Sequence, residues 1–166
     1  MDVLEAIERR RSIRRYEPRP IPDEKLTQVL EAGRWAPSAS NFQPWKFIVV
    51  KDEKVRKELA RAATYGSFLS QAPVAIAVII NPQVSNHPVE DGAAATQNML
   101  LAAYALGLGS CWIGSYGSVY EERAKGILGI PENHRLLALI SLGYPAEERV
   151  STRRPLSQLV SYDQYS

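Results

Sequence analysis

The chain has 166 residues, of which 45% are hydrophobic and 23% are charged, and its formal net charge is +2. This is enough for one domain with a hydrophobic core, and it gives no overall electrostatic basis for nucleic-acid binding. The single cysteine, Cys111, excludes an internal disulfide and fits a reducing compartment. Because the N-terminus is charged from Asp2 onward and the aliphatic run 74–80 is too short to span a bilayer, we expect a cytoplasmic protein without a membrane partner.

The N-terminal segment predicts two helices separated by a basic turn. Asp2 and Glu5 have the spacing of a capping box for the first helix. Six arginines then lie between residues 9 and 19, and the prolines that follow disfavour helix. A second helix is expected to begin at Asp23 and to end at Gly33 in a left-handed cap.

The middle of the chain predicts alternating loops, strands and helices. Residues 34–45 predict a loop, followed by a strand at 46–50 and a helix capped by Asp52. The uniformly apolar run 74–80 predicts a strand buried on both faces. Residues 88–107 predict a long helix that is apolar on most sides, so it either forms the core or is covered by a second subunit.

The C-terminal part continues this pattern. We expect a short strand at 109–114, a helix at 118–128, a buried strand at 136–144 and an irregular tail from Pro145. Together the elements predict one domain, residues 1–166, in which helices pack on a central sheet. Taken alone, their alternation favours a doubly wound parallel sheet.

The basic segment "RRRSIRR" contains candidate ligands for a phosphate. Such stretches are most often solvated helix ends, nucleic-acid patches or targeting signals. Ser12, set among arginines, adds a hydroxyl to forked guanidinium donors, and this combination suits a phosphate or a ribityl chain. The small net charge disfavours the nucleic-acid alternative.

The segment "APSASNFQPW" combines polar and bulky groups. Asn41 and Gln43 are bracketed by prolines and by Phe42 and Trp45, which is typical of contact with a planar ligand. A serine hydrolase is disfavoured, because no nucleophile elbow surrounds the serines of this loop.

Two later segments complete the candidate site. "GLGSCWIG" does not fit a dinucleotide fingerprint, since its glycine spacing is wrong and it follows a helix, so its glycines favour the approach of a flat ligand to the backbone. "STRRPLSQLV" places Arg153 and Arg154 beside a polar turn, which suggests two basic segments around one anion. No metal-ligand spacing is present in the sequence.

These segments, in this order, resemble the nitroreductase family of FMN-dependent oxidoreductases over nearly the whole chain. The resemblance rests on "RRRSIRRY", "APSASNFQPWKFIVV", "DGAAATQNMLLAAYALGLGSCWIG" and "LGYPAEE" followed by "RRPLSQLV". It implies an α+β fold with a mostly antiparallel sheet, in place of the parallel sheet that alternation suggests. It also implies an intertwined homodimer with FMN at the interface and the long helix in the dimer core.

The resemblance assigns roles to particular positions. Arg10, Arg11, Ser12 and Arg14 match positions that hold the FMN phosphate, the ribityl chain and the pyrimidine edge. Pro37, Ser38, Ala39 and Asn41 match the loop that reaches the flavin from the partner subunit, and Trp112, Ile113 and Gly114 match the segment that borders flavin N5. Arg153 and Arg154 match a late basic pair on the phosphate.

The implied activity is a ping-pong oxidoreduction, in which NADH or NADPH reduces the flavin and a small-molecule acceptor then reoxidises it. Nitroaromatics, quinones and flavins are the acceptors expected of the family. No residue is assigned as a catalytic acid or base, and Arg14 is expected to act electrostatically. Two alternatives stay open, namely a dehalogenating or flavin-fragmenting enzyme on the same fold and a non-catalytic flavin-binding module.

Overall fold

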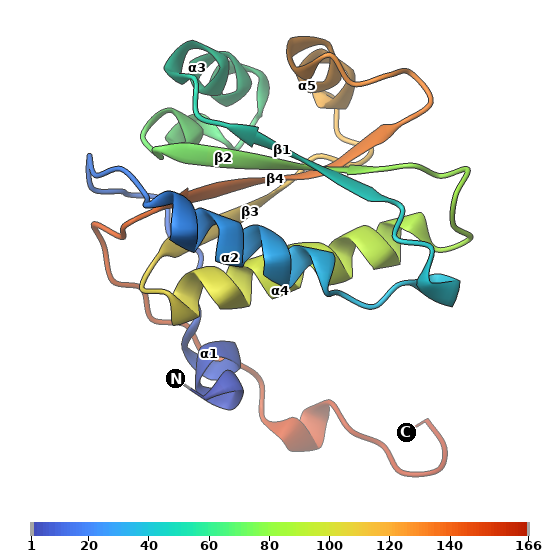
Figure 1. The fold of residues 1–166 in the computed structure, drawn as a ribbon. Helices are drawn as coiled ribbons and strands as arrows, with labels where there is room; N and C mark the ends of the chain where they lie inside the picture. Colours follow the sequence, from blue (N-terminus) through green and yellow to red (C-terminus); the bar gives the residue numbers. More distant parts are fainter. Residues whose placement is uncertain (1, 166) are drawn as a thin grey trace.

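A four-stranded sheet forms the centre of the computed structural model, which describes residues 2–165 (Figure 1). Its strands are β1 (Trp45–Val50), β2 (Val74–Ile80), β3 (Gly109–Gly114) and β4 (Arg135–Gly143), in the order β1-β2-β4-β3. Every neighbouring pair is antiparallel. This confirms the α+β fold implied by the family resemblance, and the parallel sheet suggested by alternation is wrong.

The reason lies in the connection between the first two strands. Val50, at the end of β1, pairs with Ala75 at the start of β2, so the link between them begins and ends at the same end of the sheet. Within that link, the helix that follows β1 packs on a short 3-10 turn at Ser67–Ser70 and brings the chain back. A helix between two strands therefore does not by itself make the strands parallel.

Helices cover both faces of the sheet, as Figure 1 shows. The helices of the described chain are α1 (Val3–Arg9), α2 (Asp23–Arg34), α3 (Glu53–Ala62), α4 (Pro88–Ala105) and α5 (Glu121–Leu128), of which α1 contacts α4. The helices α3 and α5 lie on one face, and α2 and α4 lie on the other. Every residue of β2 is buried, as its apolar run predicts. No helix within residues 2–165 is long and apolar enough to cross a membrane.

The helix ends match the expected signals in part. Asp52 caps α3, because its side chain accepts a hydrogen bond from the Val55 N–H at 2.9 Å. Asp2 makes no side-chain cap hydrogen bond, so the expected capping box is wrong. Gly33 lies inside α2 instead of ending it in a left-handed cap. A Cβ there would be 2.9 Å from Met99 Cγ, so this glycine allows α2 to pack closely against α4.

The C-terminal tail leaves the body of the domain. Residues 148–165 are all exposed, and apart from a 3-10 turn at Leu156–Gln158 they are irregular, as expected. Figure 1 shows the tail running away from the sheet and its helices. Leu156 and Leu159 are 74% and 52% exposed, so the tail carries apolar side chains that its own domain does not cover.

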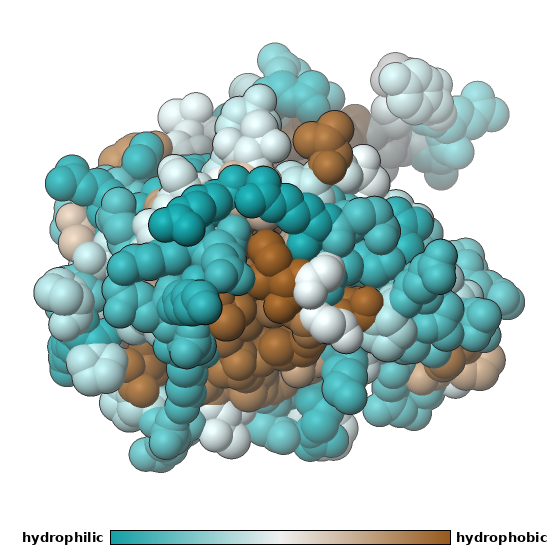
Figure 2. Space-filling model, turned by 90° about the horizontal axis from the view of Figure 1, so that it is seen from above, coloured by the Kyte–Doolittle hydropathy of each residue, from teal (hydrophilic) through white to brown (hydrophobic). Residues whose placement is uncertain are grey.

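The α3 and α5 face also exposes apolar surface. Figure 2 views the molecule from that side and shows a hollowed apolar patch framed by hydrophilic side chains. Partly buried hydrophobic residues that pack against the core layer under α3 and α5 are Ile48, Val55, Ile127, Leu128 and Ile130. An apolar patch that remains open in one chain is typical of a surface that contacts another molecule.

Candidate functional site

The arginine-rich segment is held beside the sheet as an additional edge. Ser12 forms a parallel bridge with Ser110 of β3, and the Ile13 N–H donates to the Ser110 carbonyl at 2.9 Å. Tyr16 forms an antiparallel bridge with Pro145, just after β4. The Tyr16 hydroxyl lies 2.6 Å from the Ser141 hydroxyl, and burial raises the pKa of this tyrosine. The segment is therefore fixed between β3 and the chain that follows β4.

A basic hollow of about 270 Å³ opens between these two chain segments. It is lined by Arg10, Arg11, Ser12, Arg14, Arg149, Val150, Ser151 and Arg153. No carboxylate is among these described lining residues.

The structure thus brings the first basic segment together with Arg153, as expected. Arg154 is exposed and does not line the hollow. Burial, together with the charges of Arg11 and Arg153, lowers the pKa of Arg10. We refer to this hollow as the arginine cup.

Arg11 divides its donors between the backbone and the cup. Its Nη1 donates to the carbonyls of Glu8 and Arg10 at 2.8 and 2.7 Å, and its Nη2 lies 3.4 Å from the Ser151 carbonyl. These bonds tie the end of α1 to the tail. The Nε of Arg11 is buried and has no hydrogen-bond partner among residues 2–165. A buried donor without a partner is costly, so this nitrogen calls for an acceptor that one chain does not supply.

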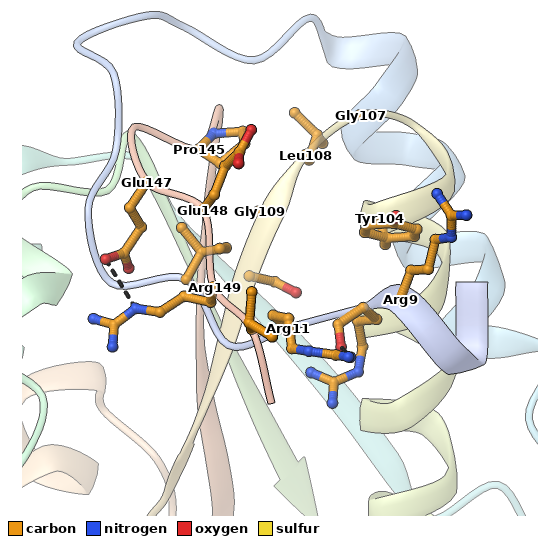
Figure 3. A pocket seen from close by; sticks show the side chains of 14 residues that line it. Arg9, Arg11, Tyr104, Gly107, Leu108, Gly109, Pro145, Glu147, Glu148 and Arg149 are labelled. Atoms are coloured by element: carbon orange, nitrogen blue, oxygen red, sulfur yellow. Dashed lines mark hydrogen bonds and ion pairs between the residues drawn. The ribbon is translucent and has the colours of Figure 1, made fainter. Parts of the chain in front are cut away.

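Glu147 holds the two sides of the cup in register, and the sequence analysis missed it. Its carboxylate accepts the Arg14 N–H at 2.6 Å and the Arg149 Nε at 3.0 Å. The bond from the Arg14 backbone lowers the pKa of this carboxyl more than any other cause. Figure 3 shows the ion pair with Arg149 beside the cup. Both residues lie in a segment expected only to be an irregular tail, and their pairing depends on the antiparallel return of the chain beside Tyr16.

A larger hollow of about 480 Å³ adjoins the arginine cup (Figure 3). The two share Arg10, Arg11, Arg149 and Val150 in their walls. Tyr104 and Leu108, from the C-terminal end of α4 and the turn after it, also line the larger hollow. The cup therefore lies at the C-terminal end of α4.

The predicted loop 37–41 lies at the other end of the same helix. The Ala39 N–H donates to Asp91 in the first turn of α4 at 2.9 Å. Because α4 has 18 residues, its two ends are about 25 Å apart at ~1.5 Å per residue. One chain therefore does not bring Pro37, Ser38, Ala39 and Asn41 to the arginine cup. Ser40 and Asn41 have φ values of 48° and 56°, so this loop is fixed in a conformation that most residues avoid.

The third predicted segment lies on an open sheet edge. In β3, Gly109, Cys111 and Ile113 share one side of the strand, and Ser110, Trp112 and Gly114 alternate with them. Because the Ser110 carbonyl bonds the Ile13 N–H outside the sheet, the N–H groups of Trp112 and Gly114 also point away from β4. A Cβ built at Gly114 would meet no atom within 4 Å among the described residues. The sheet face at Gly114 is therefore free, and beyond Ser110 this edge of β3 pairs with no other strand among the described residues, whereas the Ile113 side chain is buried in the core.

A metal centre is not formed by the residues that the structure describes, since no group of three His, Cys, Asp or Glu side chains is placed to hold an ion. Cys111 is buried, and burial raises the pKa of its thiol. It is a small core residue packed with the hydrophobic cluster under α3 and α5.

Comparison with known proteins identifies the class of this fold and site. The family model described as "Nitroreductase family" matches residues 7–66 and 60–144. A protein of Archaeoglobus fulgidus, described as "Putative NADH dehydrogenase/NAD(P)H nitroreductase", is 46% identical over 155 residues, covering 89% of this chain and 88% of its own. The chain belongs to the nitroreductase family.

Two solved structures show what ligands similar proteins bind. A protein of Desulfovibrio desulfuricans in complex with FMN is 37% identical, with a TM-score of 0.87 and coverage of 100% of this chain and 99% of that one. The NADPH:FMN oxidoreductase of Vibrio harveyi, complexed with NAD+, is 30% identical, with a TM-score of 0.88 and coverage of 99% and 78%.

Proposed function

We propose that this protein is an FMN-dependent oxidoreductase that takes electrons from NADH or NADPH and passes them to nitroaromatic, quinone or flavin acceptors by a ping-pong mechanism. The observation that carries the proposal is the arginine cup, in which five guanidinium groups converge without a carboxylate among the described lining residues. Family membership and the FMN complex of a similar protein support the same ligand.

The residues of the cup fit the phosphate of FMN. Burial first, and then the charges of Arg11 and Arg153, lower the pKa of Arg10, and a phosphate would neutralise these like charges. The buried Nε of Arg11 would gain its missing acceptor from a phosphate oxygen. Arg10, Arg11 and Arg153 are the proposed phosphate ligands, and Ser12 is the proposed ligand of the ribityl chain. The glycine spacing of "GLGSCWIG" does not fit a dinucleotide fingerprint, which favours FMN over FAD.

The open edge of β3 and Arg14 would orient the flavin ring. Gly114 lies four residues beyond Ser110, so the free edge extends about 13 Å from the cup at ~3.3 Å per residue. Its outward N–H groups at Trp112 and Gly114 are donors for the N5 side of the ring. Arg14 would place a positive charge where negative charge accumulates on the pyrimidine edge. When bound, FMN supplies the hydride and electron chemistry, and the chain needs no acid or base of its own for it.

A homodimer is part of this proposal. Loop 37–41 and the arginine cup lie at opposite ends of α4 in one chain. If two α4 helices pack antiparallel about a two-fold axis, each loop meets the cup of the other chain, and both sites are completed. The uncovered apolar side chains of the tail, Leu156 and Leu159, support a second subunit. We also propose a cytoplasmic location, which the unpaired Cys111 supports.

The test is to purify the protein, identify any bound flavin by mass spectrometry, and titrate it with NADH and NADPH without oxygen. We expect FMN, bleaching by at least one donor, and reoxidation by quinones and nitroaromatics. FAD in the extract would contradict the cofactor assignment. If FMN is bound but neither NADH nor NADPH bleaches it, the result would favour the non-catalytic flavin-binding module. Bleaching followed only by dehalogenation or flavin breakdown would favour the alternative chemistry.

A further inference from the structure

A buried carboxylate fixes the turn that follows β3. Glu121, with a side chain only 5% exposed, accepts the Gly117 N–H at 2.7 Å. It also binds Arg135 through two parallel bonds, from Nε at 2.7 Å and from Nη2 at 2.8 Å. Burial opposes ionisation of this carboxyl, but the bonds from Arg135 and Gly117 outweigh it and lower its pKa. The turn is therefore tied to an ionised group inside the domain.

A second set of bonds holds the same turn from the sheet side. The Tyr120 hydroxyl donates to the Gly114 carbonyl and lies 3.2 Å from the Ser115 hydroxyl. The N–H groups of Ser115 and Tyr116 both donate to the Leu137 carbonyl, at 3.2 and 3.1 Å. Gly117 has a φ of 70°, which permits the sharp reversal after Tyr116. Residues 115–117 thus form a rigid turn.

This rigid turn presents one aromatic ring to solvent. Tyr116 is 45% exposed. The guanidinium of Arg135 lies 4.1 Å from the centre of its ring, in cation–π contact. Because Glu121 fixes Arg135 in turn, the ring has already lost much of its freedom before any ligand binds. An ordered, exposed ring is well suited to bind a planar molecule at small entropic cost.

We propose that Tyr116 is a specificity-determining residue that forms an aromatic wall for planar aromatic electron acceptors. Tyr116 follows Gly114 by two residues in the chain, and the edge of β3 at Gly114 is the proposed N5 side of the flavin site. Glu121 and Arg135 are its positioning residues. This inference rests on the proposed function, since it places the wall beside a flavin bound along β3.

The experiment separates stacking from electron transfer. The protein is reduced with one equivalent of NAD(P)H without oxygen and mixed rapidly with either menadione or ferricyanide. Menadione takes up two electrons and two protons to become its hydroquinone, whereas each of two ferricyanide ions takes one electron and needs no stacking surface. For Tyr116→Ala we expect the half-saturating concentration of menadione to rise about threefold to tenfold, the range of an aromatic pair. Ferricyanide reoxidation and FMN affinity should match wild type.

Three further variants make the result specific. Tyr116→Phe keeps the ring and should behave like wild type. Tyr65→Ala removes another exposed tyrosine, on the turn after α3, and should change neither acceptor. Arg135→Lys keeps the charge but loses the two parallel bonds, so it should weaken menadione binding while leaving ferricyanide unchanged.

The outcomes distinguish the wall from the proposed function. Suppose that wild type binds FMN and is bleached by NAD(P)H. If Tyr116→Ala then has the same half-saturating concentration of menadione as wild type, the proposed role of Tyr116 is wrong and the proposed function stands. Equal losses with menadione and ferricyanide would show a structural role for Tyr116 and also overturn the wall. If wild type binds no flavin, the proposed function and the wall fall together.

Discussion

Neighbouring arginines at the site have different partners. Arg11 directs its Nη atoms to backbone carbonyls and keeps only the buried Nε for a ligand. Arg10 lies beside it with a lowered pKa, because burial and the charges of Arg11 and Arg153 oppose its ionisation. Arg9, one residue earlier, is exposed and pairs with Glu5 at 3.6 Å on the surface of α1. Of these three consecutive arginines, Arg9 therefore lies on the surface and Arg10 lines the cup. Arg11 lines the cup and also bonds the backbone.

These environments predict unequal effects on FMN binding. Arg10→Ala removes a partly desolvated, charge-assisted contact, so it should weaken FMN binding by about 1.5–3 kcal/mol, or roughly tenfold to hundredfold. Arg9→Ala is the matched control and should change the affinity by less than about 0.5 kcal/mol. Fluorescence titration of the apoprotein with FMN measures both. Equal affinities for Arg10→Ala and wild type would show that the cup does not hold the phosphate.

Arg14 should affect the redox potential of the flavin more than its affinity. Its side chain extends past Phe68, with the guanidinium 5.8 Å from the ring centre, instead of pairing with an acid. If it faces the pyrimidine edge, Arg14→Ala removes a positive charge that stabilises reduced flavin over oxidised flavin. The midpoint potential should then fall and reduction by NAD(P)H should slow. A spectroelectrochemical titration checks this, and an unchanged potential with a weaker FMN affinity would place Arg14 on the phosphate instead.

At the scale of elements, glycines decide how closely α4 and the sheet approach. A Cβ at Gly92 of α4 would lie 2.6 Å from Ile80 Cγ2 and 2.6 Å from Leu137 Cδ2. Gly126, in α5, would meet no described atom within 4 Å. Substitution of glycine by alanine should therefore change the free energy of unfolding in opposite directions at the two positions.

We expect Gly92→Ala to lower the free energy of unfolding by about 1–3 kcal/mol, because the methyl group overpacks the contact between α4 and the sheet. Gly126→Ala should raise it by about 0.5–1 kcal/mol, because alanine restricts the unfolded chain and favours helix. Urea unfolding of both variants under identical conditions gives the comparison. Destabilisation by Gly126→Ala would mean that α5 packs against a surface outside one chain.

The Glu121 network predicts a dependence of stability on pH. The folded pKa of Glu121 lies below its ordinary value of 4.5, so the fold favours the ionised form. The stabilisation is therefore fully present above about pH 5 and is lost as the pH falls through the folded pKa. Glu121→Gln should lower the free energy of unfolding by about 1.5–3 kcal/mol at pH 7, and the difference from wild type should shrink at low pH. A difference that is constant from pH 7 to pH 3 would show that packing, not charge, is responsible.

Local signals predicted the parts of this structure that depend on local chemistry. The Asp52 cap and the buried strand β2 follow from side-chain hydrogen bonding and from an apolar run. The predicted cap at Gly33 is wrong, because the sequence does not distinguish a glycine that caps a helix from one that lets Met99 pack closely against it. Local signals also do not determine whether neighbouring strands are parallel or antiparallel. The antiparallel arrangement was implied only by the resemblance to a family.

The candidate site was predictable to the same limit. The sequence predicts that the basic segment, Arg153 and Arg154 bind one anion; the structure brings the segment together with Arg153, whereas Arg154 does not line the hollow. Glu147 and Tyr116 were missed, because their importance depends on contacts with Arg14 and Arg135 that lie far apart in sequence. Long-range pairing of this kind is a property of the folded chain and leaves no spacing pattern to recognise.

At the scale of the whole molecule, the two proposed parts of the flavin site lie at opposite ends of α4. The arginine cup lies at the C-terminal end, and loop 37–41 is bonded to Asp91 at the N-terminal end. In an antiparallel pair of chains, each flavin site would take the cup from one chain and the loop from the other. The proposed arrangement would make flavin binding depend on association of the two chains, so FMN should also stabilise the dimer by mass action.

Mixed dimers test this division directly. Arg10→Ala damages the cup, and Asn41→Gly removes a loop side chain while keeping a residue that tolerates the φ of 56° found there. If sites are shared between chains, a dimer of one Arg10→Ala chain and one Asn41→Gly chain contains one doubly altered site and one wild-type site. Separately tagged chains can be coexpressed and the mixed dimer purified through both tags.

At an FMN concentration that fills wild type but neither altered homodimer, the mixed dimer should bind one FMN per two chains with wild-type affinity. That recovery follows from geometry alone, because no chain in the mixture is wild type. If each site were built within a single chain, every site in the mixed dimer would carry one defect, and no high-affinity site would appear. Stoichiometric titration of flavin absorbance distinguishes the two results, and absence of the high-affinity site would reject the shared site even if the protein is a dimer.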